Sequence, residues 1–263
     1  MHRLSSSFTH RGHELLSRLP DWLTQKVPRD HHETDAAFAH RRRVVTAVSV
    51  AGTGFLGAAL STAPNSKAFY WSTFGVAATW TVGAFASGPL HLGRMFSQHR
   101  RLRRPVLAPA AAGAGAFAVF YAGALVARRI PVLDKGLRHV LQFAAQGSTP
   151  LVVLTTVVNG AAEELFFRGA LFAAVGPRYP VRISTGMYVL ATCATRNPAL
   201  VLASAAMGAL FGAQRRATGG VQASVITHAT WSALMLRYLP PLFPAEAASA
   251  TKTPIPSLDI RTS

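Results

Sequence analysis

The chain has 263 residues, half of them hydrophobic and only 14% charged, which is too apolar and too charge-poor for an ordinary soluble domain. Its 27 lysines and arginines outnumber its 10 aspartates and glutamates, so the net charge is +17. The arginines cluster at the ends of apolar stretches, as at residues 41–43, and this pattern predicts a membrane protein that contacts lipid and no nucleic acid. A single cysteine, Cys193, excludes an internal disulfide.

Apolar stretches separated by polar or basic turns recur along most of the chain. They predict an all-α fold, a polytopic transmembrane helical bundle with about seven spans. A weakly amphipathic stretch at residues 132–146 predicts an interfacial helix. The predicted spans lie at about residues 44–62, 68–87, 106–127, 150–175, 183–195, 199–213 and 221–239.

Polar sequence flanks the predicted bundle at both ends. We expect residues 1–39 to form a cytoplasmic tail, residues 40–240 the transmembrane domain, and residues 241–263 a disordered tail. A cytoplasmic N-terminus places most arginine clusters on the cytoplasmic side, as the positive-inside bias requires. The sequence therefore predicts a multi-pass protein of the cell membrane, whether inner or plasma membrane.

Two adjacent carboxylates, Glu163 and Glu164, lie inside the apolar stretch at 150–175. Placing an ionisable group at membrane depth costs roughly 2.5 kcal/mol or more, so such residues usually serve a function. On a helix, Glu164 and Arg168 are four residues apart and share a face, which gives Glu164 a counter-ion. Glu163 points about 100° away and has no such partner nearby in the sequence. We expect a functional site here rather than only a packing ion pair.

The second half of the candidate site is His228, the only one of ten histidines in the middle of an apolar stretch. Ser224 and Ser232, one turn away on either side, form a polar stripe with it. We predict that Glu163 and His228 meet in a lipid-shielded cavity, with Asn159 and Ser232 in support. A carboxylate and an imidazole there could activate a water or hold a divalent metal such as zinc.

The spacing Glu163-Glu164-x-x-x-Arg168 resembles the Glu-Glu-x-x-x-Arg motif of the CAAX-protease and bacteriocin-processing family of intramembrane endopeptidases. Residues 216–232, which contain His228, resemble the family's last motif, usually His-x-x-x-Asn. The resemblance covers about residues 145–240.

The resemblance implies an enzyme that hydrolyses a peptide bond of a membrane-associated peptide or membrane protein. Within it, Glu163 would be the base, and Glu164 with Arg168 the supporting pair. His228 would polarise the water or the developing oxyanion, with or without a metal.

The chain departs from the family pattern at two positions. The middle motif, Phe-x-x-x-His, should fall near Tyr188, but Thr192 stands where the histidine is expected, and Ser232 replaces the final asparagine. Zinc held by Glu163 and His228 would be short of its usual ligands. Two alternatives therefore stay open: a catalytically inactive relative that acts as a membrane binding or scaffold protein, and a proton-coupled transporter.

Overall fold

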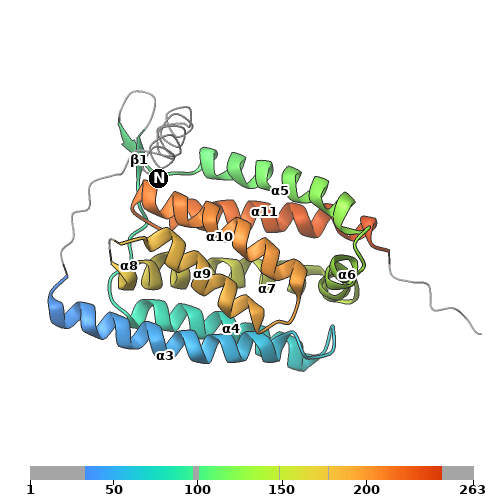
Figure 1. Ribbon diagram of the computed structural model, residues 1–263, viewed down its shortest axis with the longest axis horizontal. Helices are drawn as coiled ribbons and strands as arrows, with labels where there is room; N and C mark the ends of the chain where they lie inside the picture. Colours follow the sequence, from blue (N-terminus) through green and yellow to red (C-terminus); the bar gives the residue numbers. More distant parts are fainter. Residues whose placement is uncertain (1–32, 97–100, 148, 177, 245–263) are drawn as a thin grey trace, which may run out of the picture.

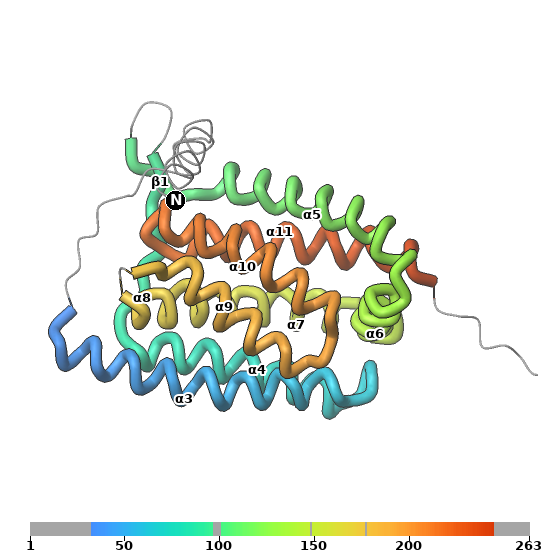
Figure 2. The backbone as a smooth tube through the Cα atoms, in the orientation of Figure 1, coloured from blue at the N-terminus to red at the C-terminus, as the bar shows by residue number. Residues whose placement is uncertain are grey.

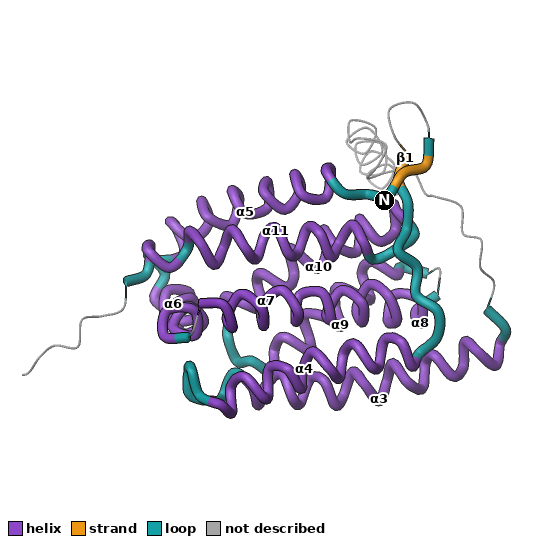
Figure 3. The backbone as a smooth tube through the Cα atoms, turned by 180° about the vertical axis from the view of Figure 1, so that it is seen from behind, coloured by secondary structure: helices purple, strands orange, loops and turns teal. Residues whose placement is uncertain are grey.

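The computed structural model describes residues 33–96, 101–147, 149–176 and 178–244. Helices dominate this part of the chain, and one short antiparallel hairpin interrupts them (Figure 3). The predicted all-α fold class is confirmed. In chain order the elements are α3 (Asp35–Ala59), α4 (Lys67–Ala86), β1 (Met95–Phe96), β2 (Leu102–Arg103), α5 (Leu107–Ala127), α6 (Pro131–Gln146), α7 (Thr149–Glu163), the π-helical η1 (Glu164–Leu171), α8 (Phe172–Val175), α9 (Pro180–Cys193), α10 (Pro198–Thr218), α11 (Gln222–Tyr238) and the 3-10 turn η2 (Pro240–Leu242).

Most of the helices run lengthwise beside one another, and α6 crosses one end of the bundle (Figure 1; Figure 2). The segments α7, η1 and α8 follow each other without a break, as one continuous rod. Helix α10 packs along α9, α11 along α5, and α3 along α4. The central rod contacts α4 and α11, so it lies where the groups of helices meet.

Local sequence explains where several helices begin and end. Thr34 and Ser66 accept hydrogen bonds from the backbone two or three residues into α3 and α4, and Asn197 does the same at the start of α10. Proline stands at the start of α6, α9 and α10, where its missing N–H costs nothing. Gly219 ends α10 in the left-handed conformation, with φ of 71°.

Two of the described helices are long and apolar enough to cross a membrane, Leu107–Ala127 and Thr149–Val175. The predicted count of seven spans therefore stays a prediction. The remaining predicted apolar stretches are also helical, but α9 has only 14 residues, fewer than a perpendicular crossing needs.

The predicted boundary between the N-terminal tail, 1–39, and the bundle falls inside α3. Residues 1–32 lie outside the described part of the chain, but α3 already begins at Asp35. Thr34 caps the helix at this start, and the buried side chain of Arg41 bonds Glu33 and donates to Ser87 Oγ and the Pro89 carbonyl. These contacts hold the first turns of α3 against the end of α4.

The predicted C-terminal tail, 241–263, is also packed where the structure describes it. Phe243 is buried with Leu141 and Leu239, and Arg138 Nη1 donates to the Pro244 carbonyl at 2.7 Å. Residues 245–263 lie outside the described part of the chain. A buried aromatic ring and a hydrogen bond thus dock residues that composition alone assigns to a tail.

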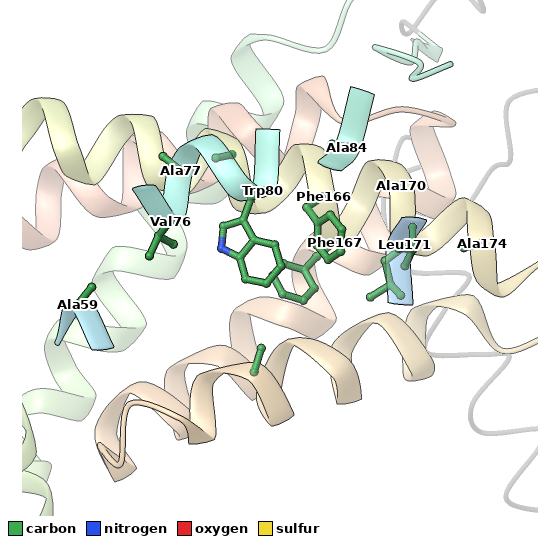
Figure 4. Packing of buried hydrophobic residues seen from close by; sticks show 13 residues of the cluster. Ala59, Val76, Ala77, Trp80, Ala84, Phe166, Phe167, Ala170, Leu171 and Ala174 are labelled. Carbon is green, nitrogen blue, oxygen red and sulfur yellow. The ribbon is translucent and has the colours of Figure 1, made fainter. Parts of the chain in front are cut away.

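The main hydrophobic core is organised around Trp80 of α4, which is fully buried. Figure 4 shows its indole against Phe166 and Phe167 of η1, with ring centroids 4.6 and 5.1 Å away. On the other side, Gly52 of α3 leaves room for the ring, since a Cβ there would come within 2.3 Å of it. This packing fixes the position of η1, which carries the glutamate–arginine motif.

The loop between α4 and α5 is tied to the turn between α10 and α11. Arg94 N donates to the Thr218 carbonyl, and Val221 N donates to the His91 carbonyl, both at 2.9 Å. The backbones approach so closely that a Cβ on Gly220 would lie 2.0 Å from Gly93 N. The turn before α11 therefore needs glycine, and this contact fixes where α11 begins.

Candidate active site

The two adjacent glutamates lie where the central rod changes from α-helical to π-helical. Glu163 is the last residue of α7, and Glu164 is the first residue of η1. π-Helical turns are rare within α-helices and occur frequently at functional sites. The two carboxylates have different environments, since Glu164 is fully buried whereas Glu163 is partly exposed to a cavity.

Glu164 joins η1 to α11. Its Oε1 accepts a hydrogen bond from Arg168 Nη1 and pairs with His228 Nδ1, each at 3.2 Å. Glu164 and Arg168 are completely buried, and His228 is 7% exposed. Because a carboxylate only accepts hydrogen bonds, His228 carries a proton on Nδ1 in this arrangement. Among the described residues, no partner bonds its other nitrogen, Nε2.

Arg168 is also enclosed by aromatic rings. Its guanidinium lies 4.5 Å from the ring centroid of Tyr188 and 5.1 Å from that of Phe211. Its Nε and Nη2 have no hydrogen-bond partner within the described part of the chain. Cation–π attraction therefore supplies part of what a desolvated guanidinium loses in hydrogen bonding.

A cavity of about 280 Å³ lies between α3, α4, α7, α9, α10 and α11. The polar groups predicted for the site mostly face it, whereas Glu164 and Arg168 lie behind its wall. The structure thus brings Glu163 of α7 and His228 of α11 to one cavity, as the sequence predicts. The residues of the predicted site that line it are Asn159, Glu163, His228 and Ser232.

Glu163 has a partner that the sequence analysis did not assign. The hydroxyl of Tyr188, on α9, donates to Glu163 Oε2 at 2.7 Å. Thr192, one turn further along α9, lines the same cavity and donates to the Tyr188 carbonyl at 2.8 Å. The sequence does contain a signal for this contact, because Tyr188 places a hydroxyl where the family motif Phe-x-x-x-His has a phenylalanine.

The imidazole of His228 is held on its faces as well as at Nδ1. It stacks on Phe211 with centroids 4.9 Å apart and planes 21° from parallel, and Trp231 lies at 5.9 Å. Gly160 of α7 approaches it closely, because a Cβ there would lie 3.2 Å from His228 Cδ2. The ring orientation is therefore set by packing from both α7 and α10.

Asn159 and Ser232 line the cavity but form no hydrogen bond with Glu163 or His228 among the described residues. Asn159 Nδ2 donates to the carbonyl of Thr155, one turn earlier in its own helix, at 2.9 Å. Ser232 is buried, with 5% of its surface exposed. Neither side chain hydrogen-bonds Glu163 or His228, so their predicted supporting role concerns the shape and polarity of the cavity.

The described residues do not match the ligand set of a structural or catalytic zinc ion. Within them, no three or more His, Cys, Asp and Glu side chains are grouped closely enough to hold a metal ion. Glu163 and His228 would supply two ligands, Thr192 stands where a further imidazole is expected, and Cys193 is exposed. Zinc sites in proteins use three or four protein ligands.

Apolar helices around a buried Glu–Arg–His cluster define a membrane protein with a polar site in its core. Residues 145–234 match the family described as Rce1-like, type II CAAX prenyl endopeptidase Rce1-like. This match confirms the resemblance to the CAAX-protease and bacteriocin-processing family of membrane proteases. No curated protein and no solved structure matches the chain. The matched segment runs from the end of α6 through most of α11 and contains the site.

Proposed function

We propose that this protein is an intramembrane endopeptidase of the CAAX-protease type. It would hydrolyse a peptide bond of a membrane-associated peptide or membrane protein with a water activated by Glu163. The observation that carries the proposal is that Glu163 and His228, from different helices, line one cavity beside a fully buried Glu164–Arg168 pair. The family match at residues 145–234 supports the same class of reaction.

Glu163 is suited to act as the base because one carboxylate oxygen is held by a hydrogen bond while the other stays available to accept a proton. Tyr188 holds Oε2, and Oε1 accepts no hydrogen bond from any described residue. Oε1 takes a proton from water as the water oxygen attacks the carbonyl carbon. The C–N bond then breaks, and the proton on Glu163 passes to the leaving amine. The products are a new carboxyl group and an amine, and Glu163 returns to its carboxylate form.

His228 would stabilise the negative charge that develops on the carbonyl oxygen. Glu164 holds the Nδ1 proton, so Nε2 is the nitrogen available to the reactants. With Nε2 protonated, the imidazolium donates to the oxyanion, and Glu164 stabilises the positive charge. Arg168 holds Glu164 in place through the hydrogen bond to Oε1.

The membrane arrangement follows the sequence prediction. We propose seven crossings made by the lengthwise helices, with α6 at the interface and the N-terminus in the cytoplasm. The location would be the cell membrane. Helices shorter than the hydrocarbon thickness, such as α9, are covered by neighbouring helices and by local thinning of the bilayer.

The test is cleavage of a peptide library by the purified protein in detergent, with products identified by mass spectrometry. Glu163→Gln should lower the cleavage rate at least about 100-fold, the lower end of the contribution of a general base. Asp35→Asn, the same change at an exposed site in α3, is the matched control and should leave the rate unchanged.

Cleavage by Glu163→Gln at the native rate would overturn the proposal. Absence of cleavage by the native protein would also overturn it, and undiminished peptide binding by Glu163→Gln would then identify a binding or scaffold protein instead.

A further inference from the structure

Tyr188 contacts two charged groups of the site, Glu163 at the cavity and Arg168 behind its wall. Its hydroxyl donates to Glu163 Oε2 at 2.7 Å, and its ring face lies 4.5 Å from the Arg168 guanidinium carbon. It comes from α9, so it reaches the central rod from a separate helix. Within the described residues, this contact is the only hydrogen bond between α9 and either glutamate.

The ring is fixed independently of its hydroxyl. Phe167 packs against it with centroids 4.9 Å apart, and Arg168 covers its face. Arg168 is in turn held by Glu164, which also holds His228. A chain of contacts therefore runs from His228 through Glu164, Arg168 and Tyr188 to Glu163. The groups proposed as base and oxyanion donor are oriented by one connected unit.

The Tyr188 hydroxyl restricts the orientation of the Glu163 carboxylate. The terminal torsion of a glutamate is broad and roughly two-fold, so an unheld carboxylate samples many orientations. A hydrogen bond to a charged acceptor is among the stronger ones in proteins. With Oε2 held, the other oxygen keeps one position relative to the cavity. Holding a catalytic group in a fixed position relative to the reactants lowers the barrier of the reaction.

We infer that Tyr188 is a positioning residue for Glu163, holding one carboxylate oxygen so that the other meets the water. This inference rests on the proposed function. Tyr188 lines the cavity, but its hydroxyl donates to Glu163 and would act on the reaction only through that carboxylate. It would thereby lock the base in a site that lacks a histidine at position 192.

Tyr188→Phe removes only the hydroxyl and keeps the ring under Arg168. We expect kcat to fall at least tenfold with KM within twofold of the native value. The thermal unfolding midpoint in detergent should not change measurably. Tyr121→Phe is the matched control, because Tyr121 packs on α5 against Phe117, away from the cavity, and this change should leave kcat and KM unaltered.

A second variant separates positioning from a general structural role. The shorter side chain in Glu163→Asp moves the carboxylate away from the Tyr188 hydroxyl and so breaks their hydrogen bond. Adding Tyr188→Phe to Glu163→Asp should therefore lower kcat by less than threefold relative to Glu163→Asp alone. An equal loss in both backgrounds would show that Tyr188 acts elsewhere and would overturn the inference. A native kcat in Tyr188→Phe, with Glu163→Gln inactive, would also overturn the inference. The proposed function would still stand in that case. If the native protein cleaves nothing, the proposed function fails together with this inference.

Discussion

Glu164 is the residue through which the two polar helices of the site meet. Its Oε1 bonds both Arg168 and His228, whereas its Oε2 has no partner among the described residues. A buried carboxylate is stable only while its counter-charges stay in place. The site therefore depends on a group that lies behind the cavity and would never touch a substrate.

Removing the counter-ion should destabilise the protein strongly. We expect Arg168→Met to lower the free energy of unfolding by about 3–5 kcal/mol, because Glu164 would be left buried and uncompensated. Adding Glu164→Gln should restore part of this stability, since no charge then needs a partner. Activity should stay low in both variants, because Glu164 no longer has the charged partner that holds it against His228. Unfolding in detergent and the peptide cleavage rate measure the two effects.

A surface pair provides the comparison for this prediction. Arg138 and Asp134 on α6 form an i,i+4 pair at 2.8 Å whose side chains are 38% and 22% exposed. Arg138→Met removes this pair together with the hydrogen bond to the Pro244 carbonyl, and it should still cost less than Arg168→Met because both side chains of the pair are partly exposed to solvent. If Arg168→Met were as mild, the buried pair would have no special role.

At the scale of elements, the position of the π-helical segment η1 sets where Glu164 and Arg168 lie relative to the other helices. It is packed by Trp80 on one side and receives His228 on another. Gly160, one turn before Glu164 on α7, lets α11 approach until the imidazole nearly touches the backbone. The geometry of the site thus depends on the distance between α7 and α11.

A side chain at position 160 should lower activity, and a larger side chain should lower it more. A Cβ would lie 3.2–3.4 Å from three ring atoms of His228, which requires a shift of a few tenths of an ångström. We expect Gly160→Ala to lower kcat several-fold. Gly160→Val should lower it on the order of 100-fold, as a displacement near 1 Å can.

Gly75 on α4 is the matched position for this test, because nothing lies within 4 Å of its Cβ direction. Gly75→Ala should leave activity unchanged and raise stability by roughly 0.5–1 kcal/mol. Native kcat in Gly160→Val would contradict the importance of the α7–α11 contact.

At the scale of the whole molecule, arginine-bearing segments far apart in the sequence gather at one end. The start of α3, the loop before α5, the turn after α8 and the end of α10 all lie there (Figure 1). The opposite end also carries charge, including Arg128 and Arg129. The described arginines at the first end are Arg41, Arg42, Arg43, Arg94, Arg101, Arg103, Arg104, Arg178, Arg182, Arg215 and Arg216.

This distribution predicts that the hairpin end faces the cytoplasm. In a Cys193→Ser background, Arg103→Cys should react with an impermeant maleimide only after the membrane is permeabilised. Arg129→Cys, at the opposite end, should react in intact cells. Both positions are exposed, so the difference reports the side of the membrane. The reverse labelling pattern would contradict the proposed orientation.

Several parts of this protein could be predicted from single residues and their spacing. Apolar runs bounded by proline, glycine and basic turns indicate the helices from α4 to α11 to within a few residues. The burial cost of Glu163, Glu164 and His228 marks them as a site, because such groups need partners wherever they are placed.

Only the tertiary structure decided which partner each group has. Tyr188 bonds Glu163, and His228 bonds Glu164, because the depth and rotation of α9 and α11 against the central rod set these contacts. Those placements depend on side-chain packing between distant segments, such as Trp80 on Phe166 and Gly160 on His228, and no local pattern encodes them. The π-helical turn of η1 is likewise seen only in the structure, since a periodicity of 3.6 residues predicts an ordinary α-helix there.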